Sequence, residues 1–167
     1  MVTKERFAQG MTVQQYLDQM GQNKDTFMKF LSEVKIKPED RAALAKMGKG
    51  LKVMVITEDW CGDALYNVPV LFKLVEGSPD IELRVFLRDK NPDLMDQYLN
   101  KGSFRSIPVF AFFDENMHEV ARLLERPQKL TEEIEARMLE ARKAIRAEKV
   151  EPWRQEIVNE VRTLLKV

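Results

Sequence analysis

The sequence predicts an α/β fold in which helices flank a mixed four-stranded sheet, in the order strand, helix, strand, helix, strand, strand, helix. Two short runs, Leu51–Ile56 and Val109–Phe113, are almost entirely apolar, as in strands that are covered on both faces. Two others, Ile81–Val85 and Met117–Leu123, mix apolar and polar residues and are typical of outer strands. Between and around these runs, apolar residues recur at the spacing of helices.

The first 50 residues are predicted to form a helical N-terminal extension. Apolar residues recur at helical spacing behind Thr12, whose hydroxyl can cap a helix while Gln15 completes a capping box. After a second helical segment, a third begins near Pro38, since proline suits a first helical turn. This third helix is expected to run to Met47 and to stop before Gly48.

The strands of residues 51–125 are joined by elements that fix their directions. Residues 61–76 form a predicted helix, and a strand–helix–strand crossover of this length makes the first two strands parallel. The next helix is predicted with Asn91 as its N-cap, Pro92 at its first position and Gly102 beyond its end. The segment Asp114–Asn116 fits a hairpin turn, which makes the last two strands antiparallel.

Residues 126–167 are predicted to be long C-terminal helices. One apolar stripe comprises Ile134, Met138, Ala141 and Ile145. Pro152 is expected to mark a kink or a break between two helices. We treat residues 1–167 as a single domain, with 51–125 as its core.

Composition argues against several classes of function. The 27 basic and 27 acidic residues balance, so no global field favours nucleic acid or an anionic membrane as a partner. No run of about 18 apolar residues is present, and no secretory h-region follows the first residues, so the expected location is the cytoplasm. The single cysteine excludes an internal disulfide and matches a reducing compartment. The single histidine, His118, lacks companion ligands, so neither a metal nor a cofactor is expected.

A short motif, Trp60-Cys61-Gly62, stands where the first predicted strand runs into its helix. Pro69 follows eight residues after the cysteine, and the sequence Ser106–Val109 opens the next apolar strand. With these features in this order, residues 51–125 resemble the thioredoxin family. The resemblance implies a thioredoxin-like fold, a redox cysteine at the strand-to-helix turn, and a cis-proline loop beside it.

Cys61 is the predicted nucleophile. A thiol in the first turn of a helix faces unpaired backbone N–H groups and the positive end of the helix dipole, which favour the thiolate. Asp63, with Glu58 and Asp59 upstream, acts in the opposite direction, and solvated charges about 4 Å apart interact by about 1 kcal/mol. The two effects nearly cancel, so no low pKa is predicted. The alternative is a buried core cysteine without a chemical role.

The resemblance also implies the surroundings of the thiol. Pro108 would follow a cis peptide bond beside Cys61, and the backbone groups of Ile107 would be exposed for an extended substrate to pair by strand addition. Trp60 would form a flat apolar wall. The predicted substrate-binding residues are therefore Trp60, Gly62, Asp63, Ile107 and Pro108.

Two departures from the family pattern concern the same step, in which a second cysteine resolves the mixed disulfide. Ala64 stands at the second position of the Cys-x-x-Cys motif, and Val55 stands where thioredoxins place a buried acid that helps to deprotonate the resolving cysteine. The predicted function is therefore that of a monothiol protein. It would take part in thiol–disulfide exchange, or form mixed disulfides with protein or small-molecule thiols, and contribute to cell redox homeostasis.

Two alternatives stay open. The chain is a possible thiol–disulfide oxidoreductase without its resolving cysteine, or a non-catalytic binding or adaptor module that uses the same groove or its N-terminal helices. A monothiol glutaredoxin-like role with glutathione or an iron–sulfur cluster is a further alternative, which the Asp63-Ala64 pair disfavours because it does not match the motif of that group.

Overall fold

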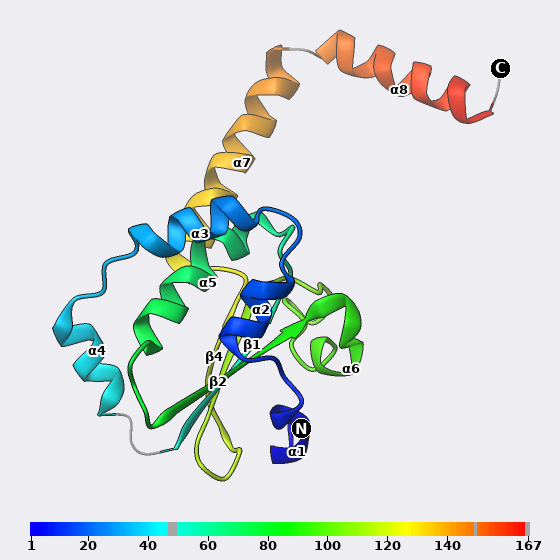
Figure 1. Cartoon of the computed structure of the whole chain (residues 1–167). Helices are drawn as coiled ribbons and strands as arrows, with labels where there is room; N and C mark the ends of the chain where they lie inside the picture. Colours follow the sequence, from blue (N-terminus) through cyan, green and yellow to red (C-terminus); the bar gives the residue numbers. More distant parts are fainter. Residues whose placement is uncertain (47–49, 149, 166–167) are drawn as a thin grey trace. The chain divides into compact units, whose positions relative to one another are not determined.

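A computed structural model describes residues 1–46, 50–148 and 150–165 of the chain (Figure 1). These residues divide into two compact units, Met1–Arg126 and Pro127–Val167, which are described separately below. The four strands and the candidate site all belong to the first unit.

The first unit is built on a mixed four-stranded sheet. Its strands are β1 (Leu51–Thr57), β2 (Ile81–Leu87), β3 (Val109–Phe113) and β4 (Glu119–Leu124), in the order β2-β1-β3-β4. β1 and β2 are parallel, whereas β3 is antiparallel to both β1 and β4. The predicted fold class is confirmed, with the two apolar strands inside the sheet and the two mixed strands at its edges.

The last strand begins two residues later than predicted. Met117 has a positive φ of 66°, and its backbone N–H donates to the carbonyl oxygen of Asp114 at 3.1 Å. Because Asp114 in turn donates its backbone N–H to His118, the hairpin turn extends beyond Asp114–Asn116. β4 therefore starts at Glu119.

Four helices precede the sheet: α1 (Lys4–Ala8), α2 (Val13–Gln19), α3 (Lys24–Glu33) and α4 (Pro38–Ala45). The predicted capping box is present, since Thr12 Oγ1 accepts the Gln15 N–H and the Gln15 side chain accepts the Thr12 N–H. The predicted end of the third segment at Met47 and Gly48 lies outside the described residues.

These helices contribute aromatic side chains to the core. Tyr16, Phe27 and Phe72 are buried and pack edge to face, with ring centroids about 6 Å apart. Phe72 belongs to α5 (Gly62–Val75), so the trio joins α2, α3 and α5. Helices α5 and α6 lie on opposite sides of the sheet in Figure 1. Both faces are covered, as the complete burial of neighbouring residues Val53 and Met54 also shows.

The helix after β2 is much shorter than predicted. A 3₁₀ turn (Arg88–Lys90) follows the strand, and α6 spans only Pro92–Met95. The Asn91 side chain does not cap this helix: its Oδ1, the atom that would accept a backbone N–H, accepts from Arg6 Nη2 at 2.8 Å, and its Nδ2 donates to the carbonyl oxygen of Leu87 at 2.7 Å. After Met95 the chain continues in tight turns that bury Tyr98, so no helix extends to Gly102.

The second unit contains α7 (Gln128–Glu148) and α8 (Val150–Leu165). The predicted kink or break was placed at Pro152, which lies within α8. Residue 149, between α7 and α8, lies outside the described residues. Within the described residues, no helix is both long and apolar enough to cross a membrane.

Candidate thiol site at the start of helix α5

Cys61 is the N-cap residue of α5, directly after the loop that leaves β1. The Cys61 side chain makes no capping hydrogen bond to the backbone N–H groups of the first turn. The thiol donates to the carbonyl oxygen of Ile107, with 3.4 Å between Sγ and O. Cys61 is only 9% exposed, so the structure presents a nearly buried thiol.

The peptide bond between Ile107 and Pro108 is cis, as expected. Ile107 is buried, and its backbone N–H donates to no other described residue. The carbonyl oxygen of Pro108 accepts the backbone N–H of Glu125 at 2.7 Å, which ties this loop to the end of β4. The carbonyl oxygen of Ile107 is therefore held beside Cys61 Sγ, while the backbone N–H of Ile107 has no acceptor among the described residues.

The net effect of these surroundings is to raise the pKa of Cys61. Burial is the largest cause, because it disfavours the charged thiolate, and the carboxylate of Asp63 raises the pKa further. The backbone N–H groups at the start of α5 and the Arg88 guanidinium lower it, but they do not compensate for burial. The thiol is consequently the dominant form at neutral pH.

Asp63 is held by a network that the sequence did not indicate. Its Oδ2 accepts a hydrogen bond from Arg126 Nη1 at 2.8 Å, and Arg126 also pairs with Glu125. Glu125 is anchored in turn by Asn100, whose Nδ2 donates to Glu125 Oε2 at 2.8 Å. Because β4 runs antiparallel to β3, its end lies beside Pro108, and this pairing brings Arg126 to the start of α5.

Trp60 lies at the surface of the site, 39% exposed. The guanidinium of Arg88 stacks over its indole ring, 4.6 Å from the centroid. No sequence pattern around Arg88 predicts this contact. The parallel register of Thr57 with Leu87 explains its position, because the residues that follow two neighbouring parallel strands emerge at the same edge of the sheet.

The two acids upstream of the thiol have separate partners. Glu58 is 7% exposed and accepts the backbone N–H of Asp89 at 2.8 Å; burial raises its pKa. Asp59 Oδ2 accepts the backbone N–H groups of Gly21 and Gln22, at 2.7 and 3.0 Å. Asp59 therefore fastens the loop to the turn between α2 and α3.

The two positions at which thioredoxins carry the resolving cysteine and the buried acid hold buried apolar residues in this chain. Ala64 is buried in the first turn of α5, and Val55 is completely buried in β1. No group of three or more His, Cys, Asp or Glu side chains that could hold a metal ion is found within residues 1–46, 50–148 and 150–165. Among these residues, the chemistry of the site therefore depends on a single sulfur atom.

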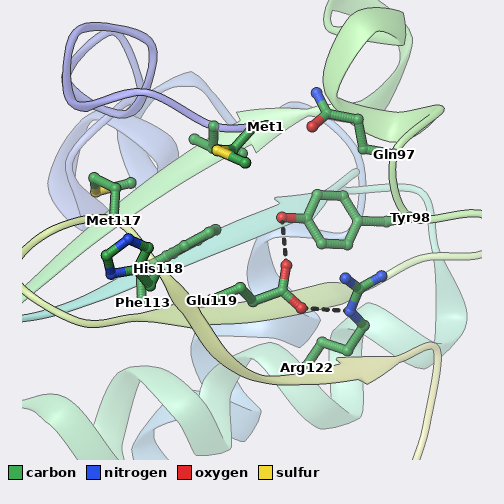
Figure 2. Close-up of a pocket in the computed structure, with 9 residues that line it drawn as sticks. Met1, Gln97, Tyr98, Phe113, Met117, His118, Glu119 and Arg122 are labelled. Carbon is green, nitrogen blue, oxygen red and sulfur yellow. Dashed lines mark hydrogen bonds and ion pairs between the residues drawn. The ribbon is translucent and has the colours of Figure 1, made fainter.

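A separate pocket of about 320 Å³ lies at the end of β3 that is opposite to the thiol site, and Phe113, the last residue of β3, lines it. In Figure 2, Glu119 lies between Tyr98 and Arg122. The Tyr98 hydroxyl donates to Glu119 Oε2 at 3.1 Å, and Arg122 Nε donates to Glu119 Oε1 at 2.5 Å. Arg122 also stacks over the Tyr98 ring, 4.9 Å from its centroid. His118 also lines this pocket.

Comparisons with known proteins place these features in a family. Residues 10–149 match the family model described as thioredoxin. No curated protein matches the chain. A protein of unknown function from Pseudomonas aeruginosa is 20% identical, with a TM-score of 0.68 over 86% of this chain and 89% of that one. An HIV epitope scaffold is also 20% identical, with a TM-score of 0.66 over 76% of this chain and 79% of that one. At these identities, the two structures support the fold alone.

Proposed function

Because the chain belongs to the thioredoxin family, we propose that it takes part in thiol–disulfide exchange as a monothiol protein with Cys61 as its nucleophile. The observation that carries this proposal is the 3.4 Å contact between Cys61 Sγ and the carbonyl oxygen of Ile107, next to the cis-proline. It puts the sulfur beside a backbone edge to which an extended substrate can be added.

The proposed reaction has two balanced steps. The Cys61 thiol first loses its proton to solvent, and the thiolate attacks one sulfur of a substrate disulfide. A Cys61–substrate disulfide forms, the substrate S–S bond breaks, and the second substrate sulfur leaves as a thiolate. An external thiolate, from a small thiol or a protein, then attacks the mixed disulfide. Its disulfide with the substrate forms, and Cys61 leaves as a thiolate that takes up a proton.

The loop before β3 positions the substrate. The unused Ile107 N–H can pair with a carbonyl oxygen of an extended chain, while Trp60 gives apolar contact on the exposed side. Gly62 leaves space above the start of α5, since a Cβ built there would meet nothing within 4 Å. A substrate disulfide on an extended protein segment fits these features. We place the exchange in the cytoplasm, where it would contribute to redox homeostasis.

Mass spectrometry of the intact protein tests this function. Incubation with a small disulfide, 2-hydroxyethyl disulfide, should add one thiol to the folded protein, and an added dithiol should remove it. Cys61→Ser should give no adduct, and Cys61→Ser/Tyr66→Cys, which carries an exposed thiol elsewhere on α5, shows the rate of an ordinary surface cysteine. A native protein that forms no adduct, although its urea-unfolded form does, would contradict the proposal.

A second candidate function, a binding or adaptor module, is favoured by the burial of Cys61 and by the raised pKa of its thiol. The buried Ala64 supports it as well, because a resolving thiol is missing. Such a module holds its partner by strand addition alone. A partner that binds native protein and Cys61→Ser with equal affinity under reducing conditions would favour this function, whereas binding lost in Cys61→Ser favours thiol exchange.

A further inference from the structure

Helix α7 has an exposed apolar stripe that the thiol site does not use. Ile134, Met138 and Ile145 are 38%, 49% and 45% exposed, and Ala141 is exposed between them. The helix is 21 residues long, and much of its remaining surface carries charged side chains. Large apolar side chains aligned on one face of such a helix indicate a contact surface.

The spacing of the stripe is that of a helix–helix seam. Its four members are separated by four, three and four residues, which is the alternation of the a and d positions in a heptad repeat. With Met138 and Ile145 at a positions, Ile134 and Ala141 occupy d positions. A partner helix with the same spacing would insert its side chains between these residues.

The charges beside the stripe select the direction of the partner. Glu135 and Arg142 occupy the e positions, and Arg137 occupies a g position, where it pairs with Glu133 of its own helix at 2.6 Å. In a parallel pair of identical helices, Arg142 faces Arg137 of the second copy, and like charges oppose association. In an antiparallel pair, Arg142 faces Glu135 of the second copy, and symmetry repeats this favourable contact.

We propose that the protein forms a homodimer in which α7 packs against α7 of a second copy in antiparallel orientation. Met138 then packs against Ala141 of the other copy, and Ile134 packs against Ile145, so four apolar layers are buried. Arg137 lies opposite Ala144 and meets no like charge. A second copy fits this surface because both its apolar spacing and its charges are complementary.

Analytical ultracentrifugation of the full chain with Cys61→Ser, which prevents intermolecular disulfides, tests the proposal. We expect a monomer–dimer equilibrium with a dissociation constant on the order of micromolar. Arg142→Glu should weaken the dimer about tenfold, because it places two acids opposite each other at both symmetric contacts. Glu135→Arg should do the same, and the double variant Glu135→Arg/Arg142→Glu should restore the affinity.

A control variant and a disruptive variant on α7 complete the test. Lys143→Glu, on the outer side of α7, should leave the dissociation constant unchanged. Met138→Glu should abolish the dimer, while far-ultraviolet circular dichroism shows that the helices remain. A monomer at all concentrations up to about 500 µM, or a dimer insensitive to Met138→Glu, would overturn the proposal. A tighter dimer in Arg142→Glu would mean a parallel pair and would overturn the antiparallel arrangement.

Discussion

Arg126 and Asp63 form an ion pair, with 2.8 Å between Nη1 and Oδ2, that fixes the acid next to Cys61 in the first turn of the thiol helix. Asp63 still raises the pKa of the Cys61 thiol, while its carboxylate is neutralised in part by Arg126. The pair also ties the start of α5 to the residue that follows β4 and to Glu125 behind it. The site therefore gains rigidity at the expense of thiolate stability.

Asp63→Asn should lower the pKa of Cys61. The substitution removes the negative charge that disfavours the thiolate but leaves the backbone of the first turn of α5 unchanged. The pH dependence of Cys61 alkylation by iodoacetamide measures the shift, with its midpoint moving to lower pH. Asp96→Asn, which breaks the exposed pair with Arg105, is the matched control and should leave the midpoint in place. An unchanged midpoint in Asp63→Asn would show that Arg126 already cancels the charge.

Glu58 should make the folded state less stable as pH rises. Its pKa is raised by burial, so the protonated form favours folding; that contribution is complete below the unfolded pKa of about 4.3 and is lost as pH rises through the folded value. Glu58→Gln keeps an acceptor for the Asp89 N–H and removes the titration. The free energy of unfolding of the native protein, minus that of Glu58→Gln, should therefore fall as the pH rises from about 4 through the raised pKa of Glu58.

The experiment is urea unfolding at a series of pH values. Glu115→Gln, at an exposed position in the β3–β4 turn, is measured in parallel as the surface control. A difference for Glu58→Gln that is constant across the series would mean that the Glu58 carboxyl titrates as it does in the unfolded chain.

Phe27→Ala should destabilise the whole first unit. The ring is 1% exposed and contacts both Tyr16 and Phe72, so its loss leaves a cavity and costs about 3–5 kcal/mol in the free energy of unfolding. Met28→Ala, the next residue of α3 but exposed, should cost less than about 1 kcal/mol. Urea unfolding followed by circular dichroism measures both. A loss confined to the N-terminal helices, with the sheet transition unchanged, would mean that these helices fold apart from the sheet.

The sheet and the position of the thiol could be predicted from the sequence because their signals are local. Continuous apolar runs identified β1 and β3, and the order of Trp60, Cys61 and Pro108 located the strand-to-helix turn and the cis-proline loop. The lengths of short elements were harder to predict from the sequence. Asn91 and Pro92 have the pattern of a helix start, but burial of Tyr98 required tight turns, and α6 ended after four residues.

The surroundings of the thiol depend on contacts that no local pattern encodes. Arg126 reaches Asp63 across 63 positions of sequence, and only the antiparallel pairing of β4 with β3 brings the two together. From the sequence, the start of the helix and the nearby acids nearly cancel in their effects on the pKa of Cys61. Burial, which depends on the packing of the Ile107 loop, decides that balance toward the protonated thiol.

Ala64→Cys should give the site an internal disulfide. Cys61 is the N-cap residue of α5 and Ala64 lies in its first turn, one helical turn later, so a sulfur on the Ala64 Cβ starts close to the first. Oxidised glutathione should convert the variant to a form 2 Da lighter than the reduced protein, without a retained adduct, and dithiothreitol should reverse this. Tyr66→Cys, exposed on the same helix, adds a second thiol that cannot reach Cys61. An Ala64→Cys variant that keeps a stable glutathione adduct on Cys61 would show that the missing resolving cysteine is not what limits this site.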